Sequence, residues 1–212
     1  LSAAAQERGF DVHRYDGSTA GSWLFMVDRP WYSGTRYFAV GVTADGALNP
    51  LVPTLATGRG AATPIISLAL LGHVDVAGSF LDRILLRASL PVTLLERGTA
   101  EPVSGAQPSN SVLVGDPRAG FLVRLFGQPE RDGFSLHLGG DVWFPLGVQA
   151  RNEGDRALRF LPRVVLAGAA DKFRWTVDAG FLIRSYASIG PPALGMTAAS
   201  EGRLGAAVGF AL

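Results

Sequence analysis

Apolar and polar side chains alternate through two neighbouring stretches within residues 63–96. In the first stretch, even positions such as Val74 are apolar or glycine, whereas most odd positions, such as Asp75, are polar or small. The second stretch repeats the alternation, with Arg87 on its polar side. Side chains alternate across a β-strand, so each stretch predicts a strand with two different faces. Because only a short turn near Gly78 separates them, the two strands form an antiparallel hairpin.

The same alternation recurs along the chain and predicts eight strands in total. They cover residues 35–44, two stretches within 63–96, 112–126, 134–146, 157–169, 173–184 and 201–212. Most are longer than the five or six residues that are roughly typical of soluble strands, and they suit a tilted crossing of about nine to eleven residues through a bilayer. Long loops cover 45–62, 97–111, 147–156 and 187–199. Their alternation with short turns is typical of an up-and-down barrel.

Charged residues and small residues share one face of each predicted strand, while large aliphatic and aromatic residues occupy the other. Small residues such as Gly120 and Gly180 fit a narrow interior. A charged interior inside an apolar exterior is the inverse of a soluble barrel, and it suits lipid, where closure satisfies every backbone donor. We therefore predict an all-β fold, an eight-stranded antiparallel up-and-down transmembrane β-barrel over residues 35–212. A soluble barrel that holds an apolar ligand is the alternative.

The composition is compatible with this fold. Of the 212 residues, 48% are hydrophobic and only 17% are charged. No run of about 18 apolar residues predicts a membrane helix. The chain has no cysteine, which excludes disulfides, thiol catalysis and thiolate metal sites. The net charge is +1 and the basic residues are scattered, so nucleic acid is not an expected partner.

Residues 1–34 form a predicted irregular lead-in, because glycine and proline interrupt their apolar positions. The small apolar residues 1–5 are similar to the tail of a secretory signal. We therefore expect export through the periplasm to a bacterial outer membrane, where lipid surrounds a monomeric barrel. The lead-in itself could enter the barrel.

A set of charged side chains is expected to face the interior. The set comprises Asp75, Arg83, Arg87, Asp116, Arg118, Arg124, Asp141, Arg159, Arg163, Arg174, Asp178, Arg184, Glu201 and Arg203. An eight-stranded barrel is just wide enough for its own side chains, so these groups must interdigitate. An unpaired buried charge costs several kcal/mol, and the planar fork of arginine can serve two carboxylates. We therefore predict a connected ion-pair network centred on Asp141, Asp178, Arg87 and Arg163.

Two readings of this network stay open. It either fills a narrow barrel or gates a narrow, weakly conducting pore, in which the surplus of arginine would favour anions. Catalysis is not expected, although His73 and His137 have Asp75 and Ser135 on the same faces. Interior histidines satisfied by neighbouring carboxylates are far commoner than catalytic ones. The sequence thus predicts a protein that is not an enzyme and has no catalytic residue, cofactor or metal site.

Two segments of the predicted strands, Gly115-Asp-Pro-Arg-Ala-Gly120 and Gly140-Asp-Val-Trp-Phe-Pro145, resemble the N-terminal barrel of OmpA-family outer-membrane proteins. Two segments of the lead-in, Arg14-Tyr-Asp-Gly17 and Gly21-Ser-Trp-Leu-Phe-Met-Val-Asp28, resemble the region before the barrel in large OmpA-like proteins. The resemblance covers about 35–212 and implies a structural or anchoring role, or a narrow pore. Many members also carry a periplasmic domain that holds peptidoglycan, which is not among these residues.

The long loops suggest a different class of function. A surface-recognition or adhesion barrel would use 45–62, 97–111 and 187–199 to bind lipopolysaccharide or an extracellular partner. Deleting a loop would then abolish surface binding without changing folding or conductance.

Overall fold

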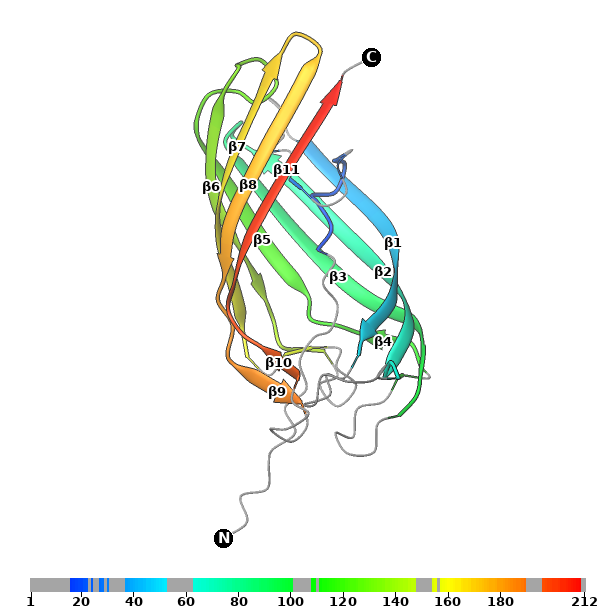
Figure 1. Cartoon of the computed structure of the whole chain (residues 1–212). Helices are drawn as coiled ribbons and strands as arrows, with labels where there is room; N and C mark the ends of the chain where they lie inside the picture. Colours follow the sequence, from blue (N-terminus) through cyan, green and yellow to red (C-terminus); the bar gives the residue numbers. More distant parts are fainter. Residues whose placement is uncertain are drawn as a thin grey trace.

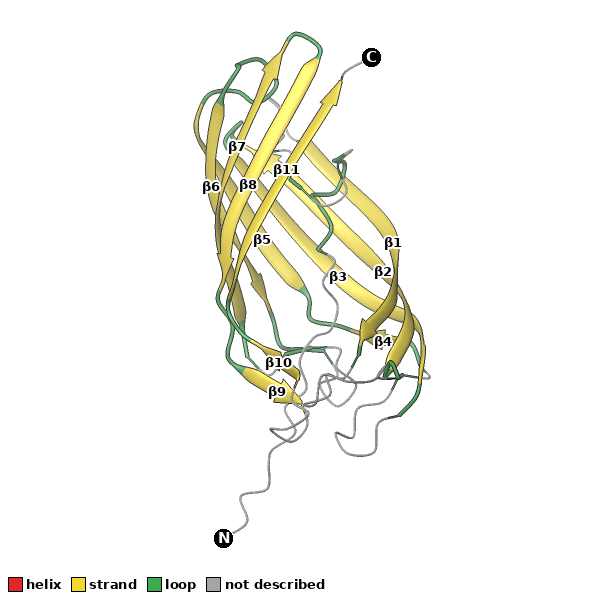
Figure 2. Cartoon of the chain, viewed as in Figure 1, coloured by secondary structure: helices red, strands yellow, loops and turns green. Residues whose placement is uncertain are grey.

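The computed structural model describes residues 16–22, 24, 27–28, 30, 37–52, 63–100, 108–109, 111–147, 154–155, 157–189 and 196–210. All its regular elements are strands (Figure 2). They are β1 (Tyr37–Leu51), β2 (Ile66–Phe80), β3 (Ile84–Gly98), β4 (Leu113–Val114), β5 (Arg118–Phe126), β6 (Ser135–Trp143), β7 (Arg159–Ala170), β8 (Phe173–Leu182), β9 (Ala187–Ile189), β10 (Met196–Ala198) and β11 (Glu201–Phe210).

Eight long strands form one antiparallel meander in the order β1-β2-β3-β5-β6-β7-β8-β11. The short β4 pairs with β3, and β9 and β10 form a separate two-stranded sheet. The all-β antiparallel arrangement predicted from the alternation is confirmed. The sheet curls around an interior but does not close, because in the described chain β1 pairs only with β2 and β11 only with β8 (Figure 1).

The observed shape is therefore an open half-barrel, and the predicted closed barrel is corrected to that extent. Alternation fixes which side chains face inward, but closure depends on strand tilt, stagger and number, which alternation does not specify. An N-terminal segment also lies in the opening between β1 and β11 (Figure 1).

Several strand boundaries differ from the sequence prediction. Strand β1 continues through the Asp45-Gly46 pair, which was assigned to a loop, because both residues have partners across the ladder on β2. The β2–β3 turn lies at 81–83 rather than near Gly78, with φ of 53° at both Leu81 and Asp82. The predicted strand 112–126 is divided into β4 and β5 by residues 115–117.

A further difference concerns the predicted last loop, 187–199. It contains the hairpin of β9 and β10, in which Thr197 lies opposite Ser188. The hairpin was missed because strands of three residues are too short to show a period of two.

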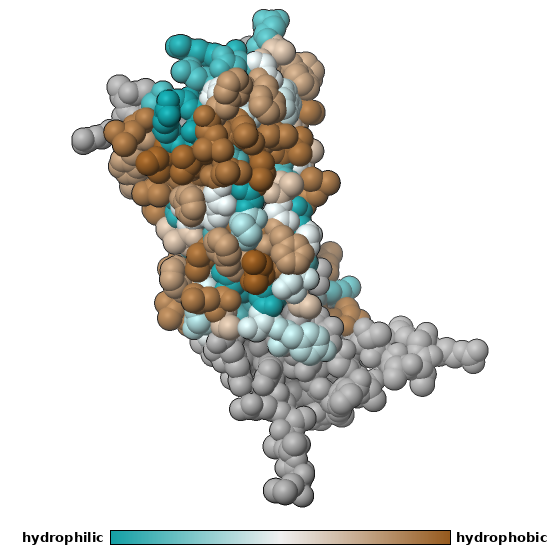
Figure 3. Space-filling view, turned by 90° about the vertical axis from the view of Figure 1, so that its left-hand side faces the viewer, coloured by the Kyte–Doolittle hydropathy of each residue, from teal (hydrophilic) through white to brown (hydrophobic). Residues whose placement is uncertain are grey.

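The two faces of the sheet have opposite character. On the outer face, Leu204 is 81% exposed and Val42 is 78% exposed. Apolar side chains also gather on the side of the molecule that includes β6 (Figure 3). On the inner face, Asp141 is completely buried, and small apolar clusters such as that of Trp143, Leu161 and Leu182 pack near the charges. The alternation in the sequence thus corresponds to an apolar outside and a largely polar inside.

Candidate functional site

Four charged side chains from four strands meet at the centre of the interior. Arg87 of β3 and Asp141 of β6 form a two-point ion pair, in which Nε donates to Oδ1 over 2.8 Å and Nη2 donates to Oδ2 over 2.5 Å. Arg163 of β7 donates through Nη1 to Oδ2 of Asp178 on β8 over 2.7 Å. Nε of Arg163 also lies 3.5 Å from Oδ2 of Asp141, which links the two pairs. The structure therefore brings together the four residues expected at the centre of the network.

Gly120 makes room for the central pair. It lies on β5, opposite Arg87 on one neighbouring strand and opposite Asp141 on the other. A Cβ atom at this position would lie 1.9 Å from Oδ1 of Asp141 and 3.0 Å from Nε of Arg87. The absence of a side chain at Gly120 thus allows the two charged groups to meet across the intervening strand.

A fifth charged group, Asp28, comes from the N-terminal segment. Its Oδ2 accepts from Nη1 of Arg87 and forms an ion pair with Nη2 of Arg163. Its Oδ1 accepts from both the backbone N and Oγ1 of Thr19, each over 2.8 Å. Asp28 is only 3% exposed. One buried carboxylate is therefore held by two guanidinium groups from different strands and by two donors from its own segment.

The ionised state of Asp28 is favoured by its surroundings. Burial raises the pKa of this carboxyl, but the positive charges of Arg163 and Arg87, with the hydrogen bond from Thr19, outweigh burial. The pKa of Asp28 is therefore held well below its ordinary value. The carboxylate is charged across the physiological pH range.

Sequence reasoning missed Asp28 as a member of the network. The residue lies in an irregular stretch without periodicity, so no pattern indicates which way its side chain points. The available signal was the excess of arginine over carboxylate on the predicted inner faces.

Further contacts hold the N-terminal segment to both edges of the opening. Oη of Tyr37 on β1 donates to the carbonyl oxygen of Ala20 over 2.8 Å. On the opposite edge, Arg203 of β11 donates to Asp16. Deeper inside, Nη2 of Arg118 donates to the carbonyl oxygen of Gly17 over 2.7 Å, and Oγ1 of Thr176 donates to that of Asp28 over 2.9 Å. The segment therefore bridges the opening from within.

A second ion-pair cluster lies around Asp116. This carboxylate accepts from the backbone N of Gly147 over 2.9 Å and from that of Asp155 over 2.8 Å. Nη2 of Arg159 lies 3.3 Å from its Oδ2. Asp155 also binds Arg159, and it accepts from Nη2 of Arg184 over 2.6 Å. Two of these contacts fix backbone on either side of residues 148–153, so the cluster holds Gly147 and Asp155 to the same carboxylate.

Trp143 links the two clusters. The guanidinium carbon of Arg159 lies 5.3 Å from the centre of its indole ring, and those of Arg118 and Arg203 lie 5.9 Å from it. A cation near an aromatic face is attracted by the ring quadrupole. Trp143 is buried on the inner face among these three arginines.

Some residues expected in the network lie apart from it. Arg83 is exposed in the β2–β3 turn, because that turn falls later in the chain than predicted. Arg174, beside the β7–β8 turn, donates to backbone carbonyls, including that of Phe173 over 3.0 Å. Arg124 pairs with Asp82 over 3.0 Å near the turns.

Two other expected members differ in their surroundings. Asp75 is buried on the inner face of β2, and within the described part of the chain its Oδ1 has no hydrogen-bond partner. Glu201 is half-exposed and lies 3.0 Å from Nη2 of Arg203.

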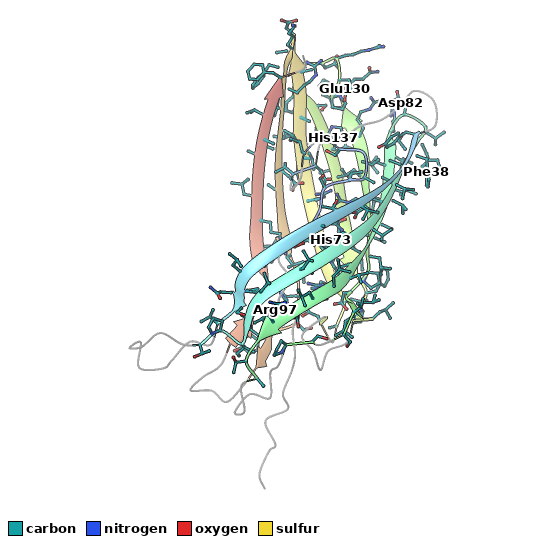
Figure 4. All side chains as sticks on the ribbon, turned by 90° about the vertical axis from the view of Figure 1, so that its right-hand side faces the viewer. Phe38, His73, Asp82, Arg97, Glu130 and His137 are labelled. Carbon is teal, nitrogen blue, oxygen red and sulfur yellow. The ribbon has the colours of Figure 1, made fainter. Side chains whose placement is uncertain are left out.

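The interior histidines make separate polar contacts and lie apart along the sheet (Figure 4). Nε2 of His73 lies 3.0 Å from Oδ2 of Asp45 on β1. Nε2 of His137 lies 2.9 Å from Oγ of Ser135, whose hydroxyl donates to the carbonyl of Ala167 over 2.7 Å. Because the Ser135 proton is used on that carbonyl, His137 must donate to Oγ. This arrangement gives the serine no base.

A cavity of about 380 Å³ adjoins the central cluster. Its lining includes Asp28, Arg87, Arg118, Arg163 and Arg203. Arginine side chains that face such a partly open cavity can bind anions through paired N–H donors. Within the described ranges, no group of three or more histidine, aspartate or glutamate side chains is arranged to hold a metal ion.

Comparison with known proteins finds no matching family model, no matching curated protein and no matching solved structure. Among the described residues there is also no helix long and apolar enough to cross a membrane.

Proposed function

We propose that the curled sheet forms the wall of a β-barrel in a bacterial outer membrane, with a structural role or a narrow, weakly conducting and anion-favouring interior. The observation that carries this proposal is the inverted polarity of the sheet. Leu204, Val42 and Phe38 project from the outer face, whereas Arg87 and Asp141 are buried on the inner face. In water this arrangement leaves large apolar groups unburied, whereas in lipid it removes them from water.

The resemblance to OmpA-family proteins supports the same proposal. Its two strand segments carry inward-facing residues of the site: Asp116 and Arg118 in the first, and Asp141 and Trp143 in the second. These motifs therefore coincide with the parts of the chain that organise the charged interior.

The proposal places one requirement on the edges of the sheet. In hydrocarbon, unpaired backbone N–H and C=O groups are too costly to leave open. Strands β1 and β11 run antiparallel to each other, because seven antiparallel pairings separate them in the meander. In the membrane these edges must therefore be paired, either directly or through further strands.

Labelling at single cysteines tests the membrane location, since the chain has no cysteine of its own. Val42→Cys and Leu204→Cys place a fluorophore on the outer face, Thr43→Cys places one on the inner face next to Val42, and Arg83→Cys places one in the exposed turn. After refolding into vesicles, lipids that carry a spin label should quench the fluorophores at 42 and 204 strongly and those at 43 and 83 weakly. Equal quenching at 42 and 43 would contradict the proposal.

The alternative of a surface-recognition barrel stays a prediction. The tips of the long loops, 53–62, 101–107 and 190–195, lie outside the described residues. No contact in the described part of the chain favours a particular loop partner.

A further inference from the structure

The Asp28 carboxylate is bound in the manner in which proteins bind a free oxyanion. Both of its oxygens are engaged, Oδ2 by Arg87 and Arg163 and Oδ1 by the N–H and O–H of Thr19. Paired guanidinium donors are a strong recognition element for carboxylate and phosphate groups. The two arginines alone would therefore form an oxyanion site if Asp28 were absent from it.

The strands are already balanced without Asp28. Arg87 has Asp141 as a two-point partner, and Arg163 has Asp178. The two arginines therefore do not depend on Asp28 to remain paired. Withdrawal of Asp28 would leave free donor groups beside the cavity rather than isolated buried charges.

The charge of the cavity changes with the position of the segment. Four arginines of the strands line the cavity, against three strand carboxylates, Asp141, Asp178 and Glu201. The strands thus contribute a net charge of +1, and Asp16 and Asp28 of the segment change it to −1. A cavity occupied by the segment repels anions, and a cavity without it attracts them.

The segment is also placed to block passage along the interior. It contacts β1 through Ala20 and β11 through Asp16. A Cβ atom at Gly205 of β11 would lie only 3.0 Å from Val27, so the segment packs closely against that strand. Its described part is held by side-chain contacts rather than by a sheet ladder, and can leave without breaking a strand pairing.

We infer that the described residues of the N-terminal segment, 16–22, 24 and 27–28, act as an internal plug and that the Asp28 carboxylate occupies an oxyanion site of Arg87 and Arg163, which binds a small carboxylate or phosphate when the plug is displaced. The plug is autoinhibitory, because the group that fills the site is part of the chain. This inference rests on the proposed function in one respect: displacement opens a path across a membrane only if the sheet lies in one.

The first test compares inorganic phosphate binding to the wild-type protein and to Asp28→Asn, each refolded in detergent micelles. The substitution keeps the shape of the side chain but removes its charge. Phosphate at millimolar concentration should raise the Tm of Asp28→Asn by at least about 2 °C and leave that of the wild type nearly unchanged. The increase should be lost in Asp28→Asn/Arg163→Gln and absent from the control Asp16→Asn, which retains Asp28. Equal responses of wild type and Asp28→Asn would overturn the inference.

A second measurement does not depend on the stability of Asp28→Asn. In Val27→Cys, the half-buried thiol faces Gly205 beside the cavity, so an increase in the rate of its labelling by a water-soluble maleimide reports release of the segment. Phosphate should accelerate labelling, whereas chloride at the same ionic strength should not. Identical rates in the two salts would refute competition for the Asp28 site.

The two proposals fail in distinguishable ways. Lipid quenching at 42 and 204 without any phosphate effect overturns the plug and leaves the membrane location standing. A phosphate effect without lipid quenching overturns the membrane location and leaves the oxyanion site standing.

Discussion

Gly120→Ala should destabilise the protein far more than an alanine substitution normally does in a strand. The added Cβ would lie 1.9 Å from Oδ1 of Asp141, 2.9 Å from its Cγ and 3.0 Å from Nε of Arg87. Asp141 is completely buried and therefore has no solvent to move into. The two-point pair must separate, and disruption of a buried ion pair costs about 3–5 kcal/mol.

The matched control is Gly202→Ala on β11, where an added Cβ meets no atom within 4 Å. Its free energy of unfolding should stay within about 0.5 kcal/mol of the wild-type value. Urea unfolding of the refolded protein, followed by tryptophan fluorescence, measures both variants. Asp141→Ala removes the atoms that clash, so the added cost of Gly120→Ala should largely disappear in that background.

Two results would refute the reasoning about Gly120. One is a Gly120→Ala variant that is as stable as Gly202→Ala. The other is a full additive cost of Gly120→Ala in the Asp141→Ala background, which would show that the added methyl group acts on something other than the ion pair.

Three further predictions concern other parts of the interior and its opening. Arg159→Ala should lower the free energy of unfolding by about 3–5 kcal/mol, because it leaves the buried Asp116 and Asp155 without this partner. The control Arg174→Ala should change it by no more than about 0.5 kcal/mol. Urea unfolding measures both variants, and equal losses would contradict the prediction. Cysteines at the paired positions Val42 and Val74 should oxidise to a disulfide. Cysteines at Val42 and Val208, on opposite sides of the opening, should stay reduced. Rapid oxidation of the second pair would mean that β1 and β11 meet directly. Because the pKa of Asp28 is lowered in the folded state, its contribution to stability is present above the ordinary carboxyl pKa and is lost as pH falls through the lower folded value. Below about pH 4, the unfolding free energy of the wild type should therefore fall more steeply than that of Asp28→Asn. Parallel pH profiles of the two proteins would contradict this prediction.

The sequence predicted the faces of the sheet well, because a period of two encodes side-chain direction directly. Arg87, Asp141, Arg163 and Asp178 were assigned to the inner face on that basis, and each lies there. Strand ends were less predictable, since local turn signals compete with pairing. The Asp45-Gly46 pair is typical of a turn, yet its cross-strand partners on β2 and the contact of Asp45 with His73 keep it inside β1.

Closure and the N-terminal segment could not be predicted from local patterns. Whether a sheet closes depends on accumulated tilt and stagger over all its strands, and no single stretch of sequence records that quantity. The position of Asp28 depends on Arg87, Arg163 and Thr176, which are distant in sequence. A stretch interrupted by Gly17, Gly21 and Pro30 carries no periodic signal by which those partners could be inferred.

The contacts of the N-terminal segment also set the order in which the molecule can be assembled. Asp28 and Arg87 are 59 positions apart, Asp28 and Thr176 are 148 apart, and Asp16 and Arg203 are 187 apart. Neighbouring strands of the meander can pair as soon as each hairpin exists, but contacts of such high sequence separation form slowly because a long loop must close first. We therefore expect Asp28 to reach Thr176 only once β8 has formed, and Asp16 to reach Arg203 only once β11 has formed. Until then we expect water to solvate Arg87 and Arg163 where Asp28 will lie, so that late folding exchanges this water for the chain's own carboxylate.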